Sequence, residues 1–294
     1  MRIIISTTLL AASLAMAPCR AAEKPQGAPL PASLVEQAKQ AREFWKLKGS
    51  IQFVAGNDLW QPGKQYKSGN DWLALACDGK NCALVPAVLE AKKEAWQGHY
   101  DDQPTAGQHL TFKAADGAPG TPVAWFRTTG APPWLKAGPV PSYYAGGKYN
   151  QLPDKKGTME FLIEMPDGKK AMLVPMLLPK SLAARLASPE ERGNQTVQGA
   201  LLLQLRTPQK RQLLPGQFGL CSGMTTPNYL LWAGDLDGDG KPDFIISYID
   251  ADGPVHLYLS GAAQRDQLAG LAGVFNSPPF GGECDGGLPP YFEN

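Results

Sequence analysis

The chain has 294 residues, enough for one large or two medium domains, and its 28 Lys and Arg against 27 Asp and Glu leave a net charge of +1. This balance excludes a general electrostatic attraction to nucleic acid or to an anionic membrane. Gly (32) and Pro (27) are frequent and spread along the chain, which favours many short strands joined by turns.

Residues 1–22 have the pattern of a secretory signal peptide. One positive charge at Arg2 precedes an apolar run over residues 3–17, and small residues suited to cleavage follow, up to Ala22. The run is shorter than the roughly 20 apolar residues of a membrane span, and no later segment is apolar enough to be one. We therefore expect a periplasmic or secreted protein with a net charge of about −1 after cleavage. Lipoprotein anchoring at Cys19 is the alternative, disfavoured by the proline before it.

Four cysteines follow the leader, and an even number indicates disulfides in an exported chain. They are Cys77, Cys82, Cys221 and Cys284. Three pairings are possible. The first two flank a Gly-containing turn, which favours a hairpin-closing bridge, and the last two would then pair by default. Free thiols are the alternative; zinc is disfavoured because there is no Cys-x-x-Cys and no nearby pair of histidines.

A helix is expected first, over residues 33–46, where Ser33 and Glu36 form a capping box. From residue 50 onward, short segments rich in β-formers alternate with Gly, Asn, Asp or Pro. The expected strands are 50–54, 71–77, 82–89, 108–113, 121–128, 199–206, 229–235, 243–249 and 255–261. Residues 158–178 predict a hairpin that turns at Asp167-Gly168, and residues 181–191 predict a second short helix.

These elements predict a mainly β protein with a few short helices, a β-rich α+β class built of antiparallel sheets. The Pro-rich stretch 129–149 is the expected boundary between two β-rich parts, residues 23–135 with the N-terminal helix and residues 136–294. Because no repeat of fixed period is present, a complete propeller or solenoid is not expected.

The most acidic segment of the chain is LWAGDLDGDGKPDFIISY, residues 231–248. Its odd loop positions 1, 3, 5, 7 and 9 are Asp235, Asp237, Asp239, Lys241 and Asp243. This spacing turns the carboxylates toward one point, and the intervening glycines allow the positive φ angles that such a loop needs. Hard oxygen ligands in this number select Ca²⁺ over zinc or copper. Position 12 is Ile246, where an EF-hand carries its bidentate Glu, and an apolar strand follows, so this is not an EF-hand.

The pattern Asp-x-Asp-x-Asp-Gly-x-x-Asp followed at once by an apolar strand resembles the calcium loop of FG-GAP/VCBS repeats, the integrin-α propeller type. The resemblance covers about 30 residues and occurs once. It implies that the four aspartate side chains and the Lys241 carbonyl bind Ca²⁺, in a strand–loop–strand setting with residues 253–262 as the next strand. Five protein oxygens nearly fill the calcium shell, so we expect a structural ion. A solvated acidic turn without an ion is the alternative, disfavoured because such close carboxylates repel one another.

No catalytic motif is evident in the sequence. The three histidines are His99, His109 and His256, and the last two lie in strand-like segments. The chain lacks HExxH, G-x-S-x-G and Gly-rich nucleotide loops. Scattered acidic pairs of a glycoside hydrolase stay open, although Glu160 and Glu164 are expected on the solvent face of their hairpin.

A group of aromatic residues lies in a loop-rich region and could hold a carbohydrate or peptide. They are Trp125, Trp134, Tyr143, Tyr144 and Tyr149. The alternative is that these rings cover an edge of the core. We therefore expect an exported, calcium-binding, disulfide-containing β-rich protein that binds a protein or carbohydrate ligand without catalysis. A secreted, carbohydrate-active hydrolase is the alternative.

Overall fold

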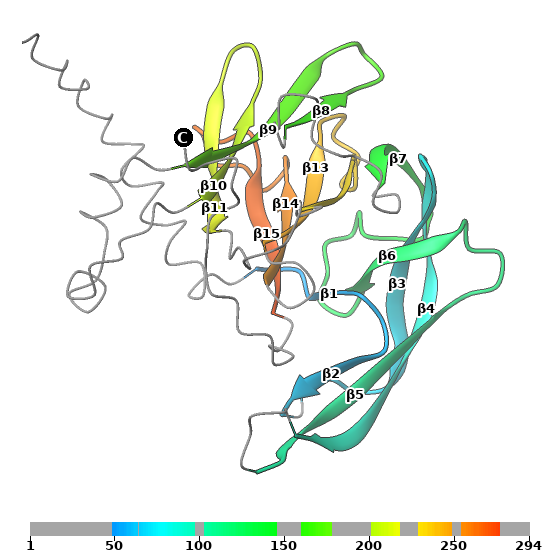
Figure 1. The fold of residues 1–294 in the computed structure, drawn as a ribbon. Helices are drawn as coiled ribbons and strands as arrows, with labels where there is room; N and C mark the ends of the chain where they lie inside the picture. The colour runs from blue at the N-terminus through cyan, green and yellow to red at the C-terminus, as the bar shows by residue number, and fades with distance from the viewer. Residues whose placement is uncertain are drawn as a thin grey trace, which may run out of the picture. The chain divides into compact units, whose positions relative to one another are not determined.

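The computed structural model describes residues 49–63, 65–97, 103–145, 160–177, 201–217, 229–248 and 254–276. All of them belong to one compact unit, Ala32–Asn294. Across these ranges the regular structure consists of β-strands paired antiparallel in two sheets (Figure 1). The predicted β-rich, antiparallel architecture is confirmed, whereas the two predicted helices, over 33–46 and 181–191, lie outside the described residues.

The larger sheet contains eleven strands in the order β1-β6-β3-β4-β7-β12-β13-β14-β15, with β5 paired to β4 and β2 paired to β5. These strands are β1 (Phe53–Ala55), β2 (Leu59–Pro62), β3 (Gly69–Asp78), β4 (Asn81–Trp96), β5 (Thr105–Ala114), β6 (Thr121–Arg127), β7 (Gly138–Ala145), β12 (Leu230–Gly234), β13 (Asp243–Ser247), β14 (Pro254–Leu259) and β15 (Gly270–Asn276). Strand β7 pairs with β4 and β12, so it joins the two groups of strands on either side of it.

The two ends of this sheet meet. The N–H of Ile51, just before β1, donates to the carbonyl of Ala272 in β15 over 2.9 Å. Two glycines make the approach possible, because a Cβ on Gly49 would lie only 2.2 Å from the Cα of Gly273. The larger sheet therefore curls until its first and last strands touch. Its enclosed core includes Phe126 and Trp232 from opposite parts of the strand order.

The smaller sheet has the order β11-β10-β9-β8. Its strands are β8 (Phe161–Glu164), β9 (Lys170–Leu177), β10 (Leu201–Arg206) and β11 (Arg211–Gln217). Side chains such as Ile163 and Leu173 pack with Phe244 and Tyr258 of β13 and β14 in a second core cluster. Fully burying one such apolar side chain contributes about 1.5–3 kcal/mol. Strands β12, β13 and β14 therefore have a core on each face.

The predicted strands match β1, β3, β4, β5, β6, β10, β12, β13 and β14, and the predicted hairpin matches β8 and β9 around Asp167 and Gly168. The sequence did not predict strands β2, β7, β11 and β15. Strand β7 lies in the Pro-rich stretch expected to separate two parts; the division at residues 135 and 136 itself stays a prediction. Among the described residues, no helix is long and apolar enough to cross a membrane.

Candidate metal centre

The acidic loop connects β12 to β13, in the strand–loop–strand setting that the sequence predicts. Gly238 and Gly240 have φ angles of 77° and 79°, in the left-handed region that other residues rarely adopt. The N–H of Gly240 donates to Oδ2 of Asp235 over 3.0 Å, and the N–H of Asp235 donates to the Pro141 carbonyl of β7 over 2.8 Å. The glycines thus fold the chain back onto the carboxylate of Asp235. The backbone of Asp235 is anchored to the neighbouring strand β7.

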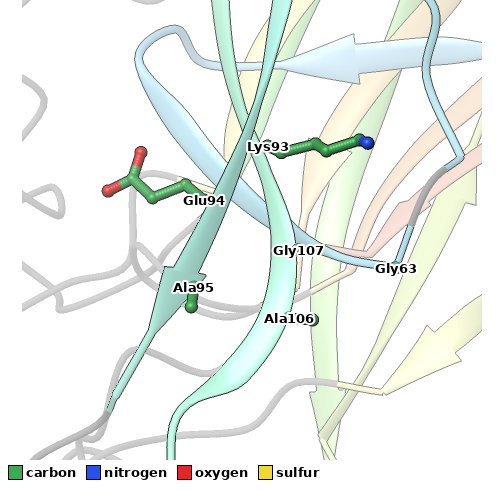
Figure 2. Close-up of a pocket in the computed structure, with 6 residues that line it drawn as sticks. All are labelled: Gly63, Lys93, Glu94, Ala95, Ala106 and Gly107. Carbon is green, nitrogen blue, oxygen red and sulfur yellow. The ribbon is translucent and has the colours of Figure 1, made fainter.

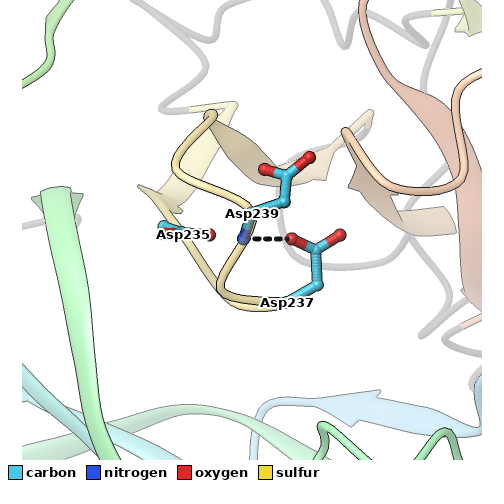
Figure 3. A group of neighbouring side chains, drawn as sticks. All are labelled: Asp235, Asp237 and Asp239. Atoms are coloured by element: carbon cyan, nitrogen blue, oxygen red, sulfur yellow. Dashed lines mark hydrogen bonds between the residues drawn. The ribbon is translucent and has the colours of Figure 1, made fainter.

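Three carboxylates converge in this loop (Figure 3). One oxygen from each of Asp235, Asp237 and Asp239 lies within 4.8 Å of the other two. Asp237 also accepts the N–H of Asp239 over 3.2 Å, the dashed line in Figure 3. Asp235 is 8% exposed, and its Oδ1 has no hydrogen-bond partner among the residues that the structure describes. A buried acceptor without a partner destabilises the folded state by about 1–3 kcal/mol, and by more when it is charged. A cation bound beside this oxygen would offset that penalty.

Asp243, the fourth predicted aspartate ligand, is fully buried at the start of β13 and lies outside this trio. Its Oδ2 accepts the N–H groups of Leu236 and Asp237, over 2.7 and 3.3 Å, and its Oδ1 accepts that of Ser260 over 2.7 Å. Burial raises the pKa of Asp243 to about 8, against the opposing effect of these N–H donors. Asp243 therefore ties the loop to the turn after β14; its role as a metal ligand stays a prediction.

The turn after β14 forms a second wall of the site, which sequence analysis did not identify. The hydroxyl of Ser260 donates to Oδ1 of Asp239 over 2.7 Å, and the N–H of Gly261 donates to Oδ2 of Asp237 over 3.0 Å. A Cβ on Gly261 would lie 2.4 Å from that same oxygen, so a larger residue here would displace the Asp237 carboxylate. No local signal in the sequence identifies these two residues, because their approach to the loop depends on the pairing of β14 with β13.

The electrostatics of the trio are uneven. Burial, and then the neighbouring Asp239, raise the pKa of Asp237. Burial acts in the same direction on Asp239, but hydrogen bonds from Ser260 and Lys241 outweigh it and lower the pKa. The Lys241 ammonium lies 3.0 Å from Oδ2 of Asp239 and offsets part of its charge. A divalent cation bound among the three carboxylates would add to this compensation.

The aromatic residues proposed for ligand binding are mostly in the core. Trp125 is 2% exposed, stacks on Phe112 with ring centroids 4.8 Å apart, and donates its indole N–H to the Gly56 carbonyl. Tyr143 is buried, while Trp134 and Tyr144 are half-buried against the two core clusters. The fifth residue, Tyr149, lies outside the described residues. These positions favour the interpretation that the four described rings cover the core.

Of the three histidines, His99 lies outside the described residues and His256 is fully buried on β14. His109 lies between two carboxylates, with Nε2 2.7 Å from Asp58 and Nδ1 2.9 Å from Glu94. Hydrogen bonding to Asp58 is the largest contribution to its raised pKa. A ring whose two nitrogens both donate to carboxylates has no lone pair free to act as a base. His109 therefore joins two strands and a turn and is not available as a general base.

A small hollow of about 250 Å³ lies beside β4 and β5 (Figure 2). It is lined by Gly63, Lys93, Glu94, Ala95, Ala106 and Gly107. In Figure 2 the side chains of Lys93 and Glu94 point to opposite sides of their strand. Its volume is below the roughly 300–1,000 Å³ of typical ligand sites, and we assign it no function.

The predicted bridge between Cys77 and Cys82 is confirmed and joins a directly opposed pair of β3 and β4. Cys221 and Cys284 lie outside the described residues, so their pairing stays a prediction. No family model, no curated protein and no solved structure matches this chain.

Proposed function

We propose that the loop from Asp235 to Asp243 binds one Ca²⁺ ion, which stabilises an exported binding protein. The observation that carries the proposal is the buried Oδ1 of Asp235, which lacks a hydrogen-bond partner within the described ranges and belongs to the same cluster as the Asp237 and Asp239 carboxylates. A bound cation would supply that partner and offset the repulsion among the three acids.

Calcium is the proposed ion because the converging donors are all hard oxygens. Ca²⁺ takes six to eight such ligands in flexible geometry, whereas thiolate and imidazole donors, which favour zinc or copper, are not part of the described cluster. The ligands would be carboxylates of Asp235, Asp237 and Asp239, with Asp243 and the Lys241 carbonyl completing the set. This is the ligand pattern of the FG-GAP/VCBS-type loop that the sequence resembles.

A structural role is proposed because the loop contacts three separate parts of the fold. It follows β12, it is anchored to Pro141 of β7, and it receives hydrogen bonds from Ser260 and Gly261 after β14. An ion bound among these carboxylates would fasten the β12–β13 hairpin to the β14–β15 turn. Binding to the folded state alone stabilises it by RT ln(1 + [Ca²⁺]/Kd).

The signal-like leader and the Cys77–Cys82 bridge support export, because disulfides persist in oxidising compartments. Extracellular calcium modules bind at about 10⁻⁴–10⁻³ M, which suits an ion held outside the cytoplasm. The proposed activity is binding of a protein or carbohydrate. Within the described residues, the carboxyl groups with raised pKa are Asp237 and Asp243, both in this loop, and no observation favours the hydrolase alternative.

Elemental analysis and thermal unfolding of the mature protein test the proposal. We expect about one calcium per chain, a Tm that falls when EGTA is added, and recovery with Ca²⁺ but not with Mg²⁺. Asp235→Asn should abolish this response, because it removes charge from the buried oxygen pair. Asp116→Asn, at an exposed turn between β5 and β6, is the matched control and should respond like the wild type. Absence of calcium together with an EGTA-insensitive Tm would refute the proposal.

A further inference from the structure

A groove of about 560 Å³ lies on the four-stranded sheet, and none of its lining residues belongs to a predicted site. Four directly opposed residues run across the sheet and line it: Leu162 of β8, Met172 of β9, Arg206 of β10 and Arg211 of β11. Opposed residues of antiparallel strands point to the same face. This row, which we name the arginine row, is therefore one continuous surface with an apolar half and a cationic half.

The cationic half of the groove contains more positive charge than its described neighbours offset. Lys170 and Lys210 line it as well. Lys170 has an ion pair, with Glu164 at 2.9 Å. The Lys210 ammonium lies 3.2 Å from the Gln267 carbonyl, and Nε of Arg206 donates to the Gln204 side chain. In the part of the chain that the structure describes, no carboxylate forms an ion pair with Arg206, Lys210 or Arg211.

Like charges directly opposite one another on adjacent strands destabilise a sheet. The Arg206–Arg211 pair is such an arrangement, and it becomes favourable when an anion lies between the two guanidinium groups. Each guanidinium presents a planar fork of N–H donors that matches the oxygens of a carboxylate, phosphate or sulfate. The two arginines that line this groove are therefore suited to an oxyanion.

The apolar half of the row indicates what the oxyanion is attached to. Leu162 is 53% exposed, one of two large hydrophobic side chains with such exposure among the described residues, and Met172 beside it is half-buried. An apolar body lying over these two side chains would leave its charged end at the arginines. The volume of the groove falls within the roughly 300–1,000 Å³ of small-molecule sites.

We propose that the arginine row binds a small amphiphilic anion, with its oxyanion held by Arg206 and Arg211 and its apolar part packed on Leu162 and Met172. This site is separate from the calcium loop in both residues and chemistry. It supplies the protein with a binding activity of its own.

Titration calorimetry with dissolved probes below their micelle concentrations tests the ligand class. The probes are octyl phosphate and octanoate, with inorganic phosphate and the neutral octyl glucoside as controls. We expect at least one octyl anion to bind at least tenfold more tightly than either control. If neither octyl anion binds, or if octyl glucoside binds equally well, the proposal is wrong.

Variants test the site. Arg211→Gln should weaken binding at least tenfold, and Leu162→Gln should remove the preference for octyl phosphate over inorganic phosphate. Lys113→Gln, an exposed lysine of β5, is the matched control, and Asp235→Asn in the calcium loop should likewise leave octyl anion binding unchanged. Arg211→Glu should abolish binding yet raise the Tm of the ligand-free protein, because it replaces a repulsive cross-strand pair with an attractive one. Equal binding by the Lys113→Gln and Arg211→Gln variants would refute the site.

Discussion

Protonation of His256 should weaken the packing between the two sheets. His256 lies on β14, fully buried, and its Nδ1 faces the Pro215 carbonyl of β11 at 3.0 Å and the Tyr258 hydroxyl at 2.9 Å. A carbonyl can only accept, so Nδ1 carries the hydrogen and Nε2 is the unprotonated nitrogen. Nε2 is buried and has no hydrogen-bond partner in the described part of the chain. Burial accordingly lowers the pKa of His256 to about 4.

The size and sign of the pH effect follow from this shift. In the unfolded chain the pKa of a histidine is about 6.5. Between this pKa and that of the folded protein, His256 binds a proton in the unfolded state but not in the folded state. The stabilising contribution is present above pH 6.5 and is lost as the pH falls toward 4. Integrating over this window gives a loss of about 2.5 kcal/mol in the free energy of unfolding at about pH 4.5.

His256→Phe isolates this contribution from that of the acidic groups, since phenylalanine keeps a ring of similar shape and does not titrate. The Pro215 carbonyl keeps its hydrogen bond from Tyr258, at 2.7 Å. Urea unfolding in calcium buffer, followed by tryptophan fluorescence, measures the free energy of unfolding of both proteins from about pH 7.5 to about pH 4.5. As the pH falls across this range, the free energy of unfolding of the variant should rise by about 2.5 kcal/mol relative to that of the wild type. If the difference between the two proteins does not change with pH, His256 is not buried as a neutral ring.

Three further changes probe the loop, the bridge and the sheet packing. Gly261→Ala should weaken calcium binding about tenfold in a dialysis measurement, because the added Cβ displaces the Asp237 carboxylate; affinity equal to the wild type would contradict the proposed second wall. Replacing Cys77 and Cys82 by Ala should lower the stability by about 2 kcal/mol, or roughly 4–8 °C in Tm, and an unchanged melting curve would show that the bridge does not contribute. Leu173→Ala should cost about 3 kcal/mol in urea unfolding and Leu162→Ala less than about 0.5 kcal/mol, because only Leu173 is buried; equal costs would mean that the assigned faces of β8 and β9 are wrong.

Local patterns in the sequence were sufficient to predict the hairpins and most strands. In β8, Phe161 and Ile163 are buried while Leu162 and Glu164 are exposed, the alternation expected of a strand with one wet face. The bridge between Cys77 and Cys82 was equally predictable, since both cysteines flank one turn. Strand β7, which was not predicted, contains Pro139 and Pro141 and pairs with β4 and β12, which are distant in sequence.

The loop from Asp235 to Asp243 also has some features that could be predicted from the sequence and others that could not. Its turn geometry is local: the spacing of the aspartates and the two glycines predicted positive φ angles and the convergence of four carboxylates, of which the structure brings three together. The approach of Ser260 and Gly261 could not be predicted, because it depends on how β14 pairs with β13. The same pairing buries Asp243.

By itself the sequence determined the β-rich class, one disulfide and the position of an acidic turn, because each depends on neighbours within a few residues along the chain. Only the tertiary structure decided which faces are buried. Strand β13 is one apolar run because Ile245 faces the enclosed core of the large sheet while Phe244 and Ile246 face the smaller sheet. The arginine row likewise exists only because four strands align in register. Such contacts form between residues far apart in sequence, where hydrophobic burial and strand pairing act on the whole chain at once.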